Sequence, residues 1–330
     1  MKQVIKRILR EKFQTIDIIR RYWKFFIMPK CIYPRKLKDF YFKMTGVVLN
    51  IENPKRFTEK IQWRKIYDNS FVYSILSDKY LVRKWIQYKI GDTYLIPLLG
   101  VWDNVEEIEF SSLPNSFVLK TNNGCATNII VKDRQEFNQR EAITNLKIWL
   151  KEPFWFNYGF EMHYSRIVPK IISEKYMKPD NGKNDLSDYK FYCFKGVPKY
   201  CQLIQNRTQG ETIDFFDMEW NLQEFVGMNP KGKNSDVFPT KPSNFDEMVN
   251  VASILACGFE FVRVDMYEIN NKVYFGEMTF TPGSGIGKFN PEQWDKKLGD
   301  LWDIYEPQVS ESLEKEIKQI YENELSDFVC

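Results

Sequence analysis

The sequence has little of what most metal and disulfide sites require. Its 330 residues include a single histidine, His163, which excludes a site built from several histidines. We expect His163 to be a structural histidine whose hydrogen bonds are satisfied. The six cysteines show no CxxC spacing, which favours free thiols in a reducing compartment. No run of about 18 apolar residues is present, and the N-terminus lacks the apolar core and cleavage site of a signal peptide.

The residues that are abundant indicate a folded protein. Hydrophobic residues make up 43% of the chain and aromatic residues 16%, which is typical of proteins with a large buried core and argues against disorder. A chain of 330 residues is also long enough for two or three subdomains.

Positive charge is concentrated at the N-terminus. Residues 1–43 hold 13 Lys and Arg against 3 Asp and Glu, whereas the rest of the chain holds 34 against 41. Apolar residues recur there at helical spacing, which predicts a basic amphipathic helix within an extension over residues 1–50. Two interpretations stay open: the helix lies on an anionic membrane leaflet, or its apolar stripe docks on the domain behind it. Nucleic acid is disfavoured because the bulk of the protein is acidic and would be repelled.

Residues 261–288 form the most informative stretch. Two runs in which polar and apolar residues alternate flank Asn270-Asn271, as in a hairpin of half-buried strands. A glycine-rich segment, PGSGIG, follows the second run. The polar positions of the two runs are Arg263, Asp265 and Tyr267 in the first and Glu277, Thr279 and Thr281 in the second.

The length of the turn decides which of these side chains meet. With a three-residue turn in which Asn271 is left-handed, one face carries Arg263, Asp265, Glu277 and Thr279. With a two-residue turn, Asp265 and Glu277 point to opposite faces. We expect the three-residue turn, because two carboxylates and a guanidinium on one face suit divalent cations and phosphate. The alternative is a surface hairpin with a salt-bridged polar face.

A second candidate site residue, Lys120, lies at the end of an expected strand. The run SFVLKTNNG ends in a turn of small residues that leads back into NIIVKD. This geometry can lay backbone N–H groups and one ammonium along a polyphosphate, although the Walker A pattern is absent. The alternative is an ordinary hairpin.

The order of the expected elements predicts the α+β class. Helices are expected over residues 58–67, from Ser77 as the N-cap to Gly91, and over 134–151, 245–257, 291–302 and 310–327. Antiparallel strands are expected over residues 188–194, 197–207 and 211–217. Helices therefore precede a set of antiparallel strands that are covered by further helices.

Several segments, taken in order, resemble one known family. The strand ending in Lys120, the run SEKYM, the tripeptide DYK and the pattern R-x-D…E-x-T…P-G resemble the nucleotide site of the ATP-grasp fold. FTEKIQWRKIYD, LSDKYLVRKW, YLIPLLGVWD and YFGEMTFTPGSG resemble its TupA-like branch, named for teichuronopeptide synthesis, over residues 57–294. The resemblance implies two α+β subdomains that clasp ATP, with a catalytic domain over residues 51–330 and a lid-like subdomain near residues 115–175.

The resemblance also implies roles for the matching residues. The ATP ligands it implies are Lys79 and Lys120 for the phosphates, Glu174, Lys175, Tyr176 and Met177 for adenine, Asp188 for the ribose, and Lys190 and Arg207 for further phosphate contacts. The metal and catalytic groups it implies are Asp265, Glu277 and Thr279 as Mg²⁺ ligands, Arg263 on the transferring phosphoryl group, and Gly283 with its neighbours Ser284 and Gly285 as oxyanion donors. Thr279 stands where many ATP-grasp ligases have a metal-binding asparagine, and the loop NNGCATN lacks their usual Gly/Ser-rich makeup.

With ATP and Mg²⁺ as cofactors, the resemblance implies a carboxylate–amine ligase. Transfer of the γ-phosphate makes an acyl phosphate, which an amine then attacks. The implied carboxylate belongs to a sugar or lipid-linked saccharide precursor of a cell-surface polysaccharide. We expect a cytoplasmic enzyme, which the membrane interpretation of residues 1–43 would hold at the inner membrane face. The alternatives are a glycosyltransferase or a sugar kinase of the same pathway, and a membrane-surface scaffold with a degenerate site. The absence of a DxD tripeptide counts against the glycosyltransferase.

Overall fold

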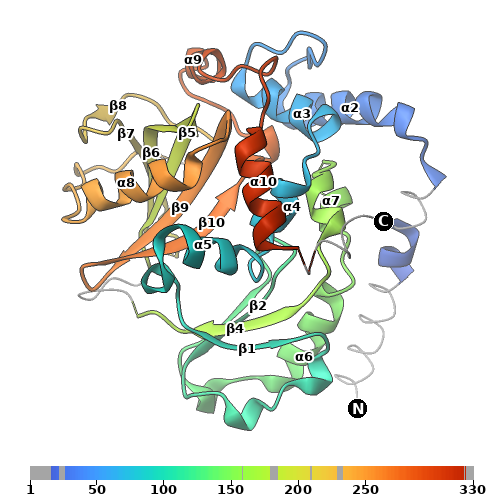
Figure 1. Cartoon of the computed structure of the whole chain (residues 1–330), viewed down its shortest axis with the longest axis vertical. Coiled ribbons are helices and arrows are strands. Elements are labelled where there is room, and N and C mark those ends of the chain that lie inside the picture. The colour runs from blue at the N-terminus through green and yellow to red at the C-terminus, as the bar shows by residue number, and fades with distance from the viewer. Residues whose placement is uncertain are drawn as a thin grey trace.

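Two antiparallel sheets organise the molecule. The computed structural model describes residues 16–21, 27–157, 159–178, 185–208, 210–228, 233–322 and 324. One sheet has four strands in the order β1-β4-β2-β3, and the other has six in the order β10-β9-β5-β6-β7-β8 (Figure 1). With helices packed around both sheets, the structure confirms the α+β class. In the part of the chain that is described, no helix is both long and apolar enough to cross a bilayer.

The elements have the following bounds. The strands are β1 (Leu98–Trp102), β2 (Phe117–Thr121), β3 (Asn128–Val131), β4 (Ile171–Lys175), β5 (Asp188–Phe194), β6 (Val197–Gln205), β7 (Thr212–Phe216), β8 (Leu222–Gln223), β9 (Phe261–Ile269) and β10 (Lys272–Thr279). The α-helices are α2 (Tyr33–Thr45), α3 (Phe57–Tyr67), α4 (Phe71–Ser77), α5 (Val82–Ile90), α6 (Gln139–Trp149), α7 (Phe154–Asn157), α8 (Phe245–Ala256), α9 (Gln293–Asp300) and α10 (Glu311–Ile320).

The six-stranded sheet is buried on both faces. Tyr189, Phe191 and Cys193 of β5 point into a core shared with α4, α5, α8 and α10. Tyr192 and Phe194, one position out of phase, point into a second core shared with α3 and α9. Because successive side chains of a strand point to opposite faces, an unbroken apolar run such as this one suits a strand covered on both sides.

The four-stranded sheet has its own core. Phe117, Leu119 and Ile171 pack with Leu146 of α6, which lies against this sheet (Figure 1). The sheet includes β1, which begins at Leu98, so one of its strands lies outside the range 115–175 that the sequence predicts for a lid.

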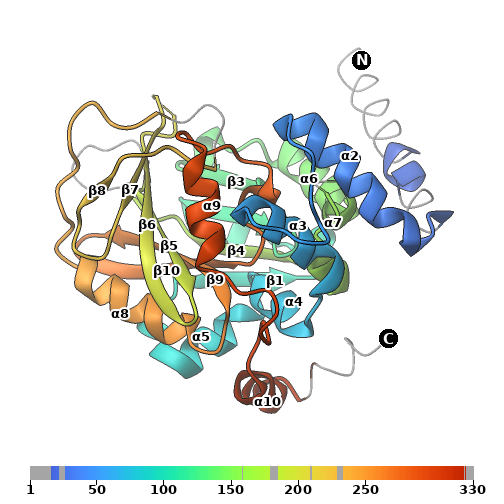
Figure 2. The same ribbon diagram turned by 90° about the horizontal axis from the view of Figure 1, so that it is seen from above.

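Helix α2 docks on the body of the protein. Tyr33, Leu37 and Tyr41 are buried along one side of the helix, and the Tyr41 hydroxyl lies 2.8 Å from Thr58 Oγ1 on α3. Helix α2 and helix α8 lie at opposite sides of the molecule (Figure 2). Residues 33–45 of the extension therefore pack on the domain behind them, which leaves the choice between docking and membrane binding open for the leader helix itself. Most of the predicted leader helix, residues 1–15 and 22–26, lies outside the described residues.

The helix predicted from Ser77 to Gly91 begins later than expected, so its predicted start was wrong. Helix α5 runs from Val82 to Ile90, and Gly91 ends it as predicted. The apolar run FVYSIL forms a helix of its own, α4, and Ser77 ends it. The Asp78 carboxylate accepts the N–H groups of Tyr80 and Leu81 at 2.8 and 3.1 Å, and α5 begins at Val82. An aspartate that accepts nearby backbone N–H groups favours a turn over a continuous helix.

Candidate active site

The hairpin of β9 and β10 brings the predicted polar residues together, although by another route than expected. Asn270 and Asn271 both have positive φ, 51° and 59°, and form a two-residue turn, so the predicted three-residue turn was wrong. A bulge at Gly276 corrects the register, because Glu277 pairs with Asp265 across the hairpin. A Cβ atom at Gly276 would lie 3.0 Å from the carbonyl oxygen of Asp265, which favours glycine there.

Arg263 is the centre of the resulting cluster. Its Nε donates to Asp265 Oδ1 and its Nη2 to Asp265 Oδ2, both at 2.7 Å. The same Nη2 lies 3.1 Å from Glu277 Oε1 and 3.0 Å from Thr279 Oγ1. The predicted convergence of these four side chains is therefore confirmed as geometry.

Strand β5 adds two more predicted residues to the same face. Lys190 pairs with Asp265 in the sheet, and its Nζ makes an ion pair with that carboxylate. Asp188, at the start of β5, accepts from Arg207 and lies 3.8 Å from Lys190 Nζ. Burial by itself would raise the pKa of Asp265, but the charges of Arg263 and Lys190 outweigh burial and lower it. Asp265 is therefore a carboxylate at neutral pH.

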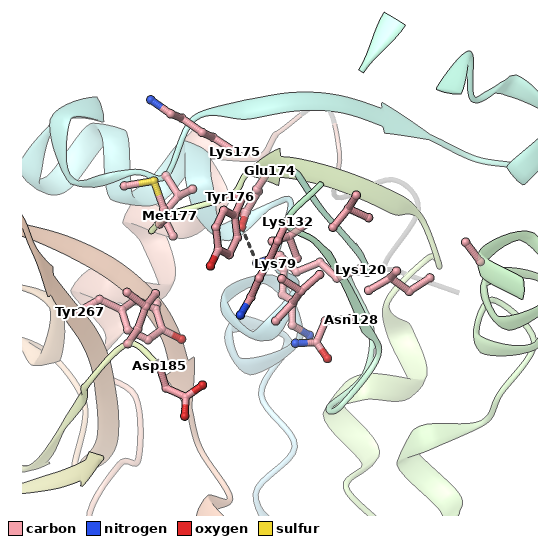
Figure 3. Close-up of a pocket in the computed structure, with 18 of the residues that line it drawn as sticks. Lys79, Lys120, Asn128, Lys132, Glu174, Lys175, Tyr176, Met177, Asp185 and Tyr267 are labelled. Atoms are coloured by element: carbon pink, nitrogen blue, oxygen red, sulfur yellow. Dashed lines mark ion pairs between the residues drawn. The ribbon is translucent and has the colours of Figure 1, made fainter. Parts of the chain in front are cut away.

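A cavity of about 760 Å³ lies between the two sheets. From the four-stranded sheet it is lined by Val118, Lys120 and residues 128–131, and from the six-stranded sheet by Tyr267, Phe275 and Gly276. Figure 3 shows Tyr267 and Asp185 across the cavity from Lys120 and Asn128. The volume lies in the range of small-molecule and cofactor sites.

The predicted adenine segment forms part of the cavity wall. Residues 174–177 all line it, and the side chain of Lys175 is exposed and points away from Lys79 and Lys120 (Figure 3). The buried carboxylate of Glu174 forms ion pairs with Lys120 Nζ at 2.6 Å and with Arg83 Nη1 at 3.2 Å. The sequence reasoning missed Arg83, although its spacing of four from Lys79 was an available signal.

Lys79 links the cavity to the cluster around Arg263. Its ammonium donates to the carbonyl oxygen of Gly124, in the loop that follows β2. Burial lowers the pKa of Lys79 and the neighbouring charge of Lys120 adds to the effect, whereas Glu277 opposes it. The ammonium of Lys79 is therefore near both Lys120 and Glu277.

The glycine turn, residues 282–285, offers fewer amide donors than predicted. The Ser284 N–H donates to the carbonyl of Thr281 at 2.9 Å, so this predicted oxyanion donor is engaged within the turn. Gly283 has a φ of 53°, and its N–H donates to no other described residue. Two side chains of α3 hold the turn: Gln62 Nε2 donates to the carbonyls of Ser284 and Gly285, and Lys65 Nζ donates to the carbonyl and hydroxyl oxygens of Ser284.

The sequence reasoning also missed Gln62, Lys65 and Glu161. The Glu161 carboxylate accepts from Thr281, directly before the glycine turn. Burial lowers the pKa of Lys65 to about 8, and Glu161 opposes that shift. These residues come from distant parts of the chain, and only the fold brings them together, so no local pattern could have revealed them.

The donor set of the hairpin fits a hard divalent cation. Asp265 and Glu277 are direct partners on neighbouring strands, and Thr279 adds a hydroxyl oxygen 3.0 Å from Glu277 Oε1. Mg²⁺ is commonly held by one or two carboxylates together with waters and phosphate oxygens. Among the described residues, no group of three or more His, Cys, Asp or Glu side chains is arranged to hold a metal ion.

His163 is not a candidate base. It is buried, and burial with the nearby charges of Arg64, Lys65 and Arg166 lowers its pKa to about 3. Its Nε2 has no hydrogen-bond partner among the described residues, so the expectation of a satisfied histidine was wrong. The imidazole is neutral at physiological pH.

Comparison with known proteins agrees with this arrangement. A family model described as TupA-like ATPgrasp matches residues 59–303, well over half of the chain. The chain belongs to the TupA-like ATP-grasp family. It is therefore an ATP-grasp ligase, and both the cavity and the cluster around Arg263 lie within the matched residues. No curated protein matches the chain.

Solved structures of other ATP-grasp enzymes are more distant. D-alanine–D-alanine ligase from Bacillus anthracis is 16% identical, with a TM-score of 0.42, and the match covers 76% of this chain and 69% of that one. The corresponding ligase from Helicobacter pylori is 14% identical, with a TM-score of 0.36, over 69% and 62%. N5-carboxyaminoimidazole synthetase from Staphylococcus aureus is 13% identical, with a TM-score of 0.37, and this chain spans 44% of it.

Proposed function

We propose that this ligase joins a carboxylate to an amine through an acyl phosphate. The observation that carries the proposal is the cluster on β9 and β10, where Arg263, Asp265 and Glu277 meet beside the cavity. A guanidinium beside two carboxylates can bind a metal–phosphate unit and stabilise the negative charge that spreads during phosphoryl transfer.

ATP would occupy the cavity between the sheets. Lys79 and Lys120 would bind its phosphates, residues 174–177 would hold adenine through their backbone, and Asp188 would accept the ribose hydroxyls. Asp265 and Glu277, with Thr279, would hold Mg²⁺, which supplies positive charge between the anionic phosphate and the anionic carboxylate. Lys190 and Arg207 pair with Asp265 and Asp188, and both would shift towards phosphate when those carboxylates bind their ligands.

The chain's own groups can perform two further tasks. Arg263 is held by Asp265 on one edge and keeps its Nη2 near Glu277 and Thr279, so it can steady the transferring phosphoryl group without reorienting. The N–H of Gly283, which has no partner among the described residues, can donate to the oxyanion of the tetrahedral intermediate.

The substrate and its location belong to the same proposal. The carboxylate would be a uronic acid or another acid of a cell-surface polysaccharide precursor, and the acceptor a primary amine. The enzyme would be cytoplasmic and would approach lipid-linked precursors at the inner membrane face through residues 1–43. Within that segment, the exposed side of α2 presents Arg35, Lys36 and Lys43 beside the apolar side chains of Phe42 and Met44, a combination suited to anionic lipid.

Product analysis by ³¹P NMR tests the proposed reaction. The protein is incubated with Mg-ATP, glucuronate and hydroxylamine as the amine. We expect ADP and inorganic phosphate to form in equal amounts, and only when both co-substrates are present. A sugar kinase would give ADP and a stable phosphoester without the amine, and a glycosyltransferase would leave ATP intact. Either pattern would contradict the proposal.

A further inference from the structure

Glu161 lies at the base of the glycine turn. It directly precedes a short 3-10 helix (Met162–Arg166), and its Oε1 accepts the hydroxyl hydrogen of Thr281, the residue before Pro282. Lys65 Nζ holds the other side of the turn through two 2.7 Å bonds to Ser284. Glu161 is thus fixed relative to Gly283 by the same contacts that shape the turn.

Glu161 contacts the end of the segment that carries Glu277. Thr281, which donates to Glu161, lies two residues after Thr279, whose hydroxyl donates to Glu277 Oε1 at 3.0 Å. Burial raises the pKa of Glu161, and the charge of Glu277 raises it further, whereas Lys65 and the bond from Thr281 oppose the shift. Both carboxylates also raise the pKa of Cys125 and of Tyr164, which are already raised by burial. These charge effects agree with the contacts through Thr279 and Thr281, which bring Glu161 close to Glu277.

The Glu161 carboxylate has no direct ion-pair partner among the described residues, so it could accept a cationic group of a substrate. Within the described ranges, no lysine or arginine forms an ion pair with it. Lys65 is near, but its three N–H donors are directed to the two oxygens of Ser284 and to Gln62 Oε1 at 3.2 Å. A carboxylate in a protected site is stabilised by a hydrogen-bonded amine or ammonium.

We propose that Glu161 binds the amino group of the acceptor substrate. The inference rests on the proposed function, in which an amine attacks the activated carboxylate. The charges of the site then divide between the two substrates: Lys79 and Arg263 lie with the phosphate and the acid, and Glu161 holds the amine beside the Gly283 N–H. Glu161 belongs neither to the cavity lining nor to the cluster on the hairpin.

Saturation kinetics with hydroxylamine as the amine probe test this assignment. Hydroxamate formation is measured with Mg-ATP and glucuronate for the wild type, Glu161→Gln and Glu161→Asp. The change to Gln keeps an oxygen that can accept from Thr281, so it removes the charge without removing that bond. We expect the KM for hydroxylamine to rise about tenfold or more in Glu161→Gln, as for the loss of a charge-assisted hydrogen bond. We expect the KM for ATP to stay within about twofold and Glu161→Asp to be intermediate.

The other outcomes are distinct. Equal hydroxylamine KM values in the wild type and Glu161→Gln would overturn the role of Glu161 while leaving the ligase intact. A parallel rise in the KM for ATP, with a lower melting temperature, would show a structural role and would also overturn it. If the wild type forms no hydroxamate, the proposed function itself fails, and the inference fails with it.

Discussion

Asp265 on β9 and Glu277 on β10 are direct cross-strand partners only because Gly276 forms a bulge between Phe275 and Glu277. Before the bulge, Val273 and Phe275 point into the core with α8, and after it Met278 points the same way. Glu277 therefore points to the opposite face, where its Oε1 lies 3.1 Å from Arg263 Nη2. One extra residue thus decides whether the second carboxylate belongs to the site or to the core.

Changing Gly276 to valine should damage the site more than the fold. The new Cβ would lie 3.0 Å from the carbonyl oxygen of Asp265 and 3.1 Å from Tyr267 Cε2, so the hairpin must shift. We expect a loss of about 1–3 kcal/mol in the free energy of unfolding. We also expect ATP turnover to fall by about 10² or more, because small misplacements of reacting groups are costly. Urea unfolding and an ADP-release assay give the two numbers, and a fall in stability with full turnover would show that the bulge does not position Glu277.

Lys120 should be required for nucleotide binding. It lies 2.6 Å from Glu174 and lines the cavity, so Lys120→Met removes the proposed phosphate contact and leaves Glu174 with Arg83 as its ion-pair partner among the described residues. We expect the Kd for Mg-ATP, measured by titration calorimetry, to rise about tenfold or more.

The matched control is Lys147→Met, which removes a lysine that pairs with Glu106 at 2.6 Å on the surface. Surface pairs contribute little, so its Kd should stay near that of the wild type. Equal weakening in both variants would mean that Lys120 acts only through net charge.

Lys65 should give the stability a measurable pH dependence. Burial lowers its pKa in the folded protein to about 8, from 10.5 in the unfolded chain. Between these values the unfolded chain binds more protons, so the free energy of unfolding should rise with pH, by up to roughly 3 kcal/mol from this group. Urea unfolding at several pH values from 7 to 10 should show this rise in the wild type relative to Lys65→Met. Parallel curves for the two proteins would contradict the assignment.

The exposed side of α2 should contribute to binding of anionic vesicles. Arg35→Glu, Lys36→Glu and Lys43→Glu reverse three charges on the side opposite the buried stripe. We expect flotation with phosphatidylglycerol vesicles to fall several-fold at physiological salt, because each basic residue near an anionic surface contributes about 1 kcal/mol.

The control for that experiment reverses three exposed lysines elsewhere: Lys296, Lys297 and Lys315. It has the same net charge but leaves α2 unchanged, so it should float like the wild type. Equal loss in both triple variants would show that total charge, and not α2, determines binding.

The sequence predicted the fold class and the side chains that meet on the hairpin because those features are local. Strand alternation placed Arg263 and Asp265 on one face, and the apolar run of β5 predicted a strand. The Asn-Asn turn could not be resolved by the same reasoning, because a two-residue turn with a bulge and a three-residue turn give the same parity beyond the bulge.

Other features depend on contacts between distant segments. Lys65 and Glu161 reach the glycine turn from α3 and from the connection after α7, and neither lies in a recognisable motif. The internal use of the Ser284 N–H follows from the left-handed conformation of Gly283 and Ser284, which the letters PGSG do not determine. Tertiary packing determines such details, so local patterns cannot predict them.

The most direct test of the central claim is trapping of the acyl phosphate with hydroxylamine. The wild type, Asp265→Asn, Glu277→Gln and the exposed-site control Glu306→Gln are compared with Mg-ATP and glucuronate. We predict hydroxamate with the wild type and Glu306→Gln, and a loss of about 10² or more in both site variants. ATP consumption that yields a stable phosphosugar and no hydroxamate, or equal hydroxamate in all four proteins, would contradict a ligase centred on Asp265 and Glu277.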